Sequence, residues 1–369
     1  MAELIATRSV PAAAWMRKLA LAALLLGFGV VVLGAYVRLT AAGLGCPDWP
    51  GCYGHLTPIG AEESVAEGAV LPGTPLDVGK AWREMIHRYA ASTLGLLIVT
   101  IAALAIATRH DPIVSPAYAL GLLATVVAQG VLGMLTVTWQ LKPLVVTLHL
   151  LFGLTTLALL WWLWLSLRAS AVEPGAVWRA APPRVAVAAR MRSPLRGLAL
   201  LALAALVAQI ALGGWTSSHY AAVACPDFPT CQGSWWPAMD FRDAFALSTA
   251  HRLDYAGGLL PNPARTAIHF THRLGALVAT CALVAAAVAA LARGTSRGTR
   301  LAGGAVLLAL AAQLTIGISM VLRGFPLWLA TAHNAGAALT LLAVVALVHS
   351  LRAPAALAAP IARPVGARR

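Results

Sequence analysis

Four histidines, His87, His149, His272 and His333, each lie inside a long apolar run of the sequence. They form two pairs, because nearly the same length of chain separates His87 from His149 and His272 from His333. A single histidine in such a run can serve simply to hydrogen-bond to a neighbouring helix. Two pairs at matching positions instead favour a functional role, since polar side chains inside a membrane are costly and usually functional.

Imidazole is a good ligand for zinc, copper, iron and nickel, so the number of ligands decides between these metals. A zinc site usually has four ligands, or three and a water molecule. Each pair offers two histidines, with Glu84 shortly before His87 in the first pair and His269 shortly before His272 in the second. Heme iron needs only one or two axial ligands, and a heme ring fits an apolar helical bundle. The pairs therefore predict two heme sites.

Neighbouring residues suit the same interpretation. Arg88 and Arg273 directly follow a histidine of each pair, where a guanidinium could pair with a heme propionate. Small residues near the ligands let a flat ring or another helix approach: Gly153, Gly275 and Gly336. The remaining histidines fall in loops or at helix ends, where we expect exposure or local hydrogen bonds: His55, His110, His219, His251 and His349. Of these, His219 and His251 could still approach a site from the second outer loop.

Two cysteine pairs share the spacing C-x5-C, Cys46 with Cys52 and Cys225 with Cys231, and each spacer contains two prolines. Zinc knuckles need a different spacing. Disulfides persist outside the cytoplasm, so we expect one disulfide in each loop. A structural role, in which the disulfide holds the loop over the site, and a redox role beside a heme are both open.

The elements that must position these residues are transmembrane helices. The chain is 60% hydrophobic and 11% charged, with a mean hydropathy of +0.78, whereas soluble domains carry about a quarter charged residues. Apolar runs long enough to span fall at 19–38, 85–107, 117–138, 144–166, 197–218, 267–291, 301–322 and 327–349. Hydrocarbon requires that backbone polar groups are satisfied internally, so we predict an all-α integral membrane protein with eight transmembrane helices.

The net charge of +14 is distributed as in a membrane protein rather than in a nucleic-acid-binding protein. If the N-terminus is inside, the excess of Lys and Arg lies entirely in the inner segments, above all between Arg168 and Arg196. Inner loops typically carry this excess, and anionic lipid is the partner that it favours. We therefore expect no nucleic-acid partner, both termini inside, and the long loops at 39–84 and 219–266 outside.

The chain contains two copies of one four-helix unit. The first copy carries CPDWPGC at Cys46–Cys52, MIHR at Met85–Arg88 and TLH ending at His149; the second carries CPDFPTC at Cys225–Cys231, FTHR at Phe270–Arg273 and TAH ending at His333. An even number of spans in each copy makes this a parallel repeat, with corresponding residues at equal depth. The predicted division is an N-terminal repeat over 1–166, an inner linker over 167–196 and a C-terminal repeat over 197–369.

Three features together resemble the heme A synthase family: RLTAAGLGCPDWPGCYG after the first span, EMIHR in the second, and histidines in the fourth, sixth and eighth spans. The resemblance covers nearly the whole chain, from about Leu21 to Leu347, and the second motif, CPDFPTC, is similar to members with cysteine pairs in both halves. The family occurs in mitochondria and in bacteria with heme-copper oxidases. It converts heme O to heme A by oxidising a ring methyl to a formyl group through successive hydroxylations.

The resemblance implies a role for each histidine pair. His272 and His333 would be the axial ligands of a resident heme b, the expected cofactor. His87 and His149 would belong to the substrate heme site, with Glu84 as an important acid beside it. A carboxylate at this spacing shares the helix face of His87 and can take part in proton transfer.

The same resemblance implies that Cys46 and Cys52 take part in the chemistry or in substrate handling. The implied partners are the substrate heme O, membrane lipid, a heme O synthase and an electron donor, and a homo-oligomer is a further expectation. The implied location is the bacterial inner membrane, with cytoplasmic termini.

Two other classes of protein fit part of the pattern. A di-heme b-type electron carrier that oxidises a quinol also needs four histidines. A transporter can have parallel repeats, but its polar residues would lie near the midplane, whereas these histidines lie toward the outer ends of their spans. For Glu84, the alternative to a catalytic role is a cap on the first turn of the second span, where an acid suits the helix dipole.

Overall fold

The computed structural model describes residues 2–60, 77–110, 113–172, 194–247 and 257–352, and in these ranges its long elements are all α-helices. Eight helices are long and apolar enough to cross a membrane: α1 (Ala2–Leu39), α3 (Val78–Ala107), α4 (Pro116–Thr138), α5 (Pro143–Val172), α7 (Pro194–Ser218), α9 (Asn262–Arg293), α10 (Arg297–Leu322) and α11 (Leu327–Ser350). The predicted all-α membrane fold is thereby confirmed. Two short helices, η1 (Ala222–Ala224) and α8 (Phe241–Ala244), lie in the second long loop.

Several helices begin earlier than the apolar runs predict, among them the two that carry His87 and His272. We expected starts near residues 85 and 267, whereas α3 begins at Val78 and α9 begins at Asn262. Asp77 caps α3 by accepting a hydrogen bond from the Lys80 main-chain N–H at 2.9 Å, and such a cap satisfies one of the free donors of the first turn. Each helix therefore extends beyond its apolar run by a polar turn that hydropathy does not detect.

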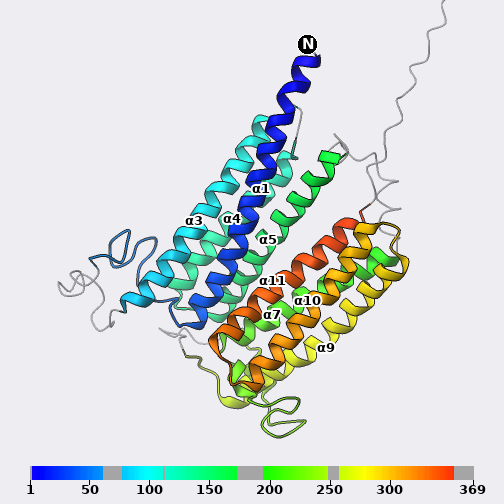
Figure 1. Ribbon diagram of the computed structural model, residues 1–369. Helices are drawn as coiled ribbons and strands as arrows, with labels where there is room; N and C mark the ends of the chain where they lie inside the picture. The colour runs from blue at the N-terminus through cyan, green and yellow to red at the C-terminus, as the bar shows by residue number, and fades with distance from the viewer. Residues whose placement is uncertain (1, 61–76, 111–112, 173–193, 248–256, 353–369) are drawn as a thin grey trace, which may run out of the picture.

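The helices contact one another in two rings (Figure 1). Helices α1, α3, α4 and α5 form one closed ring, and α7, α9, α10 and α11 form the other in the same order. The rings meet where α11 contacts α1 and α5, and where α5 contacts α7. Buried aliphatic side chains of both rings belong to one continuous core cluster, among them Leu157, Leu160 and Val344. Burial of this apolar surface packs the rings together.

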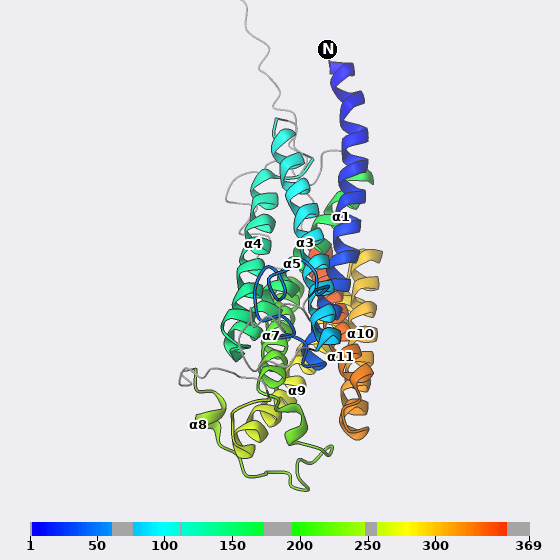
Figure 2. The ribbon, with the colours of Figure 1, turned by 90° about the vertical axis from the view of Figure 1, so that its left-hand side faces the viewer.

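Polar contacts join the two rings at both ends of the bundle. At one end, Arg38 of α1 donates to the Ser217 main-chain O at 2.9 Å, and its guanidinium lies 4.1 Å from the Tyr220 ring centroid. At the other end, Ser166 Oγ lies 3.1 Å from His349 Nε2. Because α1 and α7 end side by side, both long loops start at the same end of the bundle, opposite the N-terminus of α1 (Figure 2).

Candidate functional site

The first predicted histidine pair comes together inside the first ring. His87 projects from α3 and His149 from α5, both are partly buried, and their side chains interact electrostatically. Each imidazole packs against a glycine of the preceding helix. A Cβ at Gly34 would lie 2.8 Å from His87 Cε1, and one at Gly133 would lie 3.2 Å from His149 Cε1. The approach at Gly34 is too close for a larger residue and the approach at Gly133 is tight, so these glycines make room for the imidazole rings.

The second pair has the same construction in the second ring. His272 of α9 and His333 of α11 interact electrostatically. A Cβ at Gly213 of α7 would lie 3.2 Å from His272 Cε1, and one at Gly317 of α10 would lie 2.8 Å from His333 Cε1. The structure thus brings together each pair that the repeat predicted, on helices in equivalent positions.

The donor sets suit a heme better than a bare metal ion. Each site supplies two imidazoles from two helices, and the described residues contain no group of three or more His, Cys, Asp or Glu side chains arranged to hold a metal ion. In His87, His149 and His333 the buried Nδ1 atom has no hydrogen-bond partner among the described residues. A buried polar atom without a partner is costly, and a ligand site is one place where such atoms occur. Two axial ligands in apolar surroundings are what heme iron requires.

Three glutamines that the sequence analysis did not assign lie against the histidines. Gln129 Nε2 is 3.4 Å from His149 Nε2, and Gln313 Nε2 is 3.4 Å from His333 Nε2. Gln209 Nε2 is 3.1 Å from His272 Nδ1. The signal was present as a recurring A-Q-x3-G pattern at 128–133, 208–213 and 312–317. In each copy the glutamine stands one helical turn before the glycine that packs against the ring.

A disulfide closes each C-x5-C loop, as predicted. Cys46 bonds to Cys52 and Cys225 bonds to Cys231, with Cα–Cα distances of 4.8 and 4.7 Å. All four cysteines are buried. Asp227 shapes the second loop by accepting hydrogen bonds from the main-chain N–H groups of residues 232 and 233, and a hydrogen bond from the Thr230 hydroxyl lowers the pKa of this carboxyl. Asp48 accepts the equivalent bonds, from residues 53 and 54, in the first loop.

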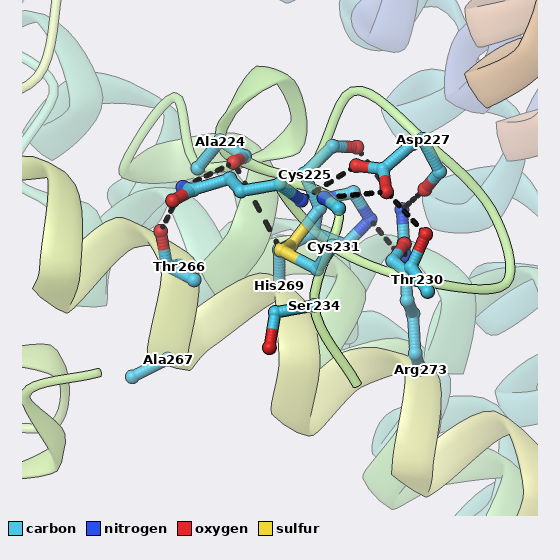
Figure 3. Close-up of a disulfide and its surroundings, with 12 residues drawn as sticks. Ala224, Cys225, Asp227, Thr230, Cys231, Ser234, Thr266, Ala267, His269 and Arg273 are labelled. Atoms are coloured by element: carbon cyan, nitrogen blue, oxygen red, sulfur yellow. Dashed lines mark hydrogen bonds between the residues drawn. A yellow bond between two sulfur atoms is a disulfide. The ribbon is translucent and has the colours of Figure 1, made fainter. Parts of the chain in front are cut away.

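The two predicted propionate-binding arginines hold these loops. Arg273 extends from α9 to the second loop (Figure 3) and donates to main-chain oxygens at 2.7–3.0 Å: those of Cys225, Asp227 and Thr230. Arg88 of α3 likewise donates to main-chain oxygens of the first loop, those of Asp48, Pro50 and Gly51. Each arginine therefore connects its disulfide loop to the helix that carries a histidine of the adjacent pair, and a propionate contact stays a prediction.

Glu84 of α3 contacts the first disulfide loop, one helical turn before His87. It is buried, its Oε1 forms an ion pair with Arg88, and its Oε2 accepts a hydrogen bond from the Cys46 main-chain N–H at 2.9 Å. The alternative capping role is wrong, because α3 begins at Val78 and no acidic residue lies in its first turn. At the equivalent position of α9, His269 is also buried, with its Nε2 3.4 Å from Arg273 Nε.

The other described histidines are either exposed or buried beside polar partners. His55 and His110 are exposed. His219 is buried and its Nδ1 lies 3.1 Å from the Trp215 main-chain O, so it is hydrogen-bonded locally, as expected. His349 is also buried, beside Ser166 at the other end of the bundle. His251 and most of the predicted linker at 167–196 lie outside the described residues.

Comparisons with known proteins agree over almost the whole chain. The family model COX15-CtaA, described as cytochrome oxidase assembly protein, matches residues 17–345. The heme A synthase of Shewanella oneidensis is 39% identical over 340 residues, which cover 91% of this chain and 96% of that protein. The heme A synthase of Methylobacterium radiotolerans is 30% identical over 324 residues, which cover 83% and 81% of the two chains.

Proposed function

This chain belongs to the COX15-CtaA family of cytochrome oxidase assembly proteins, and we propose that it acts as a heme A synthase. The proposed reaction oxidises the C8 methyl of heme O to the formyl group of heme A by successive hydroxylations, for use in heme-copper oxidases. The observation that carries the proposal is the presence of two imidazole pairs, one in each ring, within a chain similar to heme A synthases over nearly its full length.

The two sites have different proposed roles. The C-terminal repeat over 197–369 holds a resident heme b through His272 and His333, and the N-terminal repeat over 1–166 binds the substrate heme through His87 and His149. This assignment is supported by a chemical difference between the sites, an acid at Glu84 where the second site has His269. The iron of a bound heme supplies the oxidative chemistry, and the protein supplies binding, orientation and electrostatics.

Glu84 is the proposed acid–base group of the first site. Its carboxylate is held by Arg88 and by the Cys46 N–H, on the same α3 helix as His87. Burial without a partner would favour the neutral form, whereas the guanidinium favours the charged form. A carboxylate that balances between these influences suits the transfer of a proton during oxidation of the methyl group.

The cysteine loops cover the ends of both sites. Arg88 and Arg273 fix the loops through main-chain oxygens, so each loop is part of the wall around its histidine pair. We propose that this wall excludes water and orients the heme edge, and that the Cys46–Cys52 pair also takes part in substrate handling. A propionate placed beside either guanidinium would share it with the loop carbonyls.

The proposed location is the bacterial inner membrane, with cytoplasmic termini and with both disulfide loops outside. The distribution of Lys and Arg supports this orientation. The proposed partners are a heme O synthase, which would supply the substrate, and a separate electron donor. Assembly as a homo-oligomer is a further proposal.

Heme extraction tests the proposed function directly. The chain should be expressed together with a heme O synthase in a host that lacks heme A, and the extracted hemes should be separated by chromatography. We expect heme A only when both proteins are present. Extracts that contain heme b and unconverted heme O alone, from well-folded protein, would instead support the electron-carrier alternative.

A further inference from the structure

Gln209 of α7 and Val30 of α1 occupy equivalent positions in the two halves of the chain. Each stands one helical turn before the glycine against which a ligand ring packs, Gly213 for His272 and Gly34 for His87. In α4 and α10 this position is glutamine as well. Of the four ligand histidines, His87 alone thus has an aliphatic residue at this position.

The side chain of Gln209 contacts both the imidazole ring and the main-chain oxygen of His272. Its Nε2 donates to the His272 main-chain O at 3.0 Å and lies 3.1 Å from the ring Nδ1. Gly275, on the next turn of α9, provides the space, because a Cβ there would overlap Gln209 Oε1. The glutamine therefore links α7 to α9 and restricts rotation of the imidazole that it touches.

His87 has neither feature. Val30 offers no polar atom, Ala90 stands where the second half has Gly275, and the buried His87 Nδ1 has no partner among the described residues. Packing on Gly34 remains, but packing alone does not select a ring tautomer or fix its hydrogen-bonding direction. Partners of the second nitrogen orient metal-binding histidines and raise their basicity, and losing them typically weakens metal binding about 10–100-fold.

We propose that Gln209 is a positioning residue that makes the second heme site permanent, and that Val30 makes His87 the exchangeable ligand of the first site. The inference rests on the proposed function, in which one heme is resident while the other enters as substrate and leaves as product at every turnover. A ligand that must release its heme benefits from a ring with fewer restraints. A ligand of a resident heme benefits from a ring that is fixed before the heme binds.

Heme transfer to excess apomyoglobin measures this difference without relying on activity. Purified protein that carries its resident heme b is loaded with heme O, and the amount of each heme that stays bound is followed over time by extraction and chromatography. In Gln209→Met, which keeps side-chain length and removes the hydrogen bonds, we expect heme b to leave about tenfold faster or more. Heme O loss should stay as in the wild type.

The reciprocal variant installs the glutamine in the first half. In the double variant Val30→Gln with Ala90→Gly, we expect heme O to leave about tenfold more slowly, and electron paramagnetic resonance should show a narrower low-spin signal for that heme. Ala90→Gly alone and Gln140→Met, in the turn that follows α4, are matched controls that should change neither rate.

The outcomes separate this inference from the proposed function. Unchanged rates in Gln209→Met and in the double variant, with both hemes bound, would overturn the positioning role and leave the heme assignments intact. Equal changes at both sites in either variant would also overturn it. Wild-type protein that binds no heme at the second histidine pair would contradict the proposed function itself.

Discussion

The carboxylate of Glu84 accepts a hydrogen bond from the Cys46 main-chain N–H at 2.9 Å, which joins the first disulfide loop to the helix that carries His87. The same carboxylate is paired with Arg88, whose guanidinium also holds the loop. Glu84 and Arg88 therefore connect the first disulfide loop to the helix that carries His87.

Replacing Glu84 with glutamine should impair turnover while leaving the fold and heme b in place. Glutamine can still accept the Cys46 N–H, so the loop stays anchored, but it cannot transfer a proton. We expect heme A formation to fall about 100-fold, with heme O or a hydroxylated product accumulating in the extract. His269→Gln, the equivalent change in the second half, is the control and should spare the first site. Normal heme A yield in Glu84→Gln would contradict the acid–base role.

His333→Ala should remove one of the two proposed axial ligands of the proposed resident heme. We expect heme b to be lost or to become high-spin, because a single imidazole leaves the iron without its second strong ligand. Optical and electron paramagnetic resonance spectra of the purified protein in detergent provide the measurement. His110→Ala, which removes an exposed histidine, should leave the spectra unchanged. A low-spin spectrum identical to wild type in His333→Ala would exclude this residue as a ligand.

Mass spectrometry can check the disulfides without reference to activity. Each cysteine pair lies within one tryptic peptide, since no Lys or Arg separates Cys46 from Cys52 or Cys225 from Cys231. Digestion without reductant should therefore give two peptides with internal linkages, each gaining two hydrogens on reduction. Because the four cysteines are buried, alkylation of the folded protein should be slow even after reductant is added. A crosslink between the two peptides would contradict closure within each loop.

His219 should make stability depend on pH. It lies just beyond the end of α7, and burial lowers its pKa from the ordinary value of 6.5, so the folded protein holds it neutral. The unfolded chain takes up the proton first as pH falls, and stability therefore decreases below about pH 6.5. In His219→Gln, the fall in melting temperature between pH 7.5 and pH 5.5 should be smaller than in wild type. His110→Gln is the control, and an equal fall in His219→Gln and wild type would refute the prediction.

Much of the architecture follows from the sequence alone. Lipid requires about 20 apolar residues for each helical crossing, so composition and run length were enough to place all eight spans. The histidine pairs were predictable because duplication puts equivalent residues at equal depth. The disulfides were predictable because a five-residue spacer with two prolines holds each cysteine near its own partner.

Other features depend on how the helices start and cross. The position of Glu84 in the second turn follows from the start of α3 at Val78, which a polar cap fixes outside the apolar run. The use of Arg88 and Arg273 to hold the loops follows from loop backbones folding over those helices. Hydropathy predicts neither feature, because it measures the free energy of transfer into lipid and contains no information on side-chain direction.

The difference between Gln209 and Val30 was found from sequence and tertiary structure together. The letters of the repeat were present in the sequence, yet a glutamine in an apolar run has no assigned partner until the crossing of α7 and α9 brings it to His272. Sequence by itself determined which residue types enter the membrane and in what order. Tertiary structure decided which of them touch, because contacts between helices depend on crossing geometry and on small residues such as Gly275 that permit close approach.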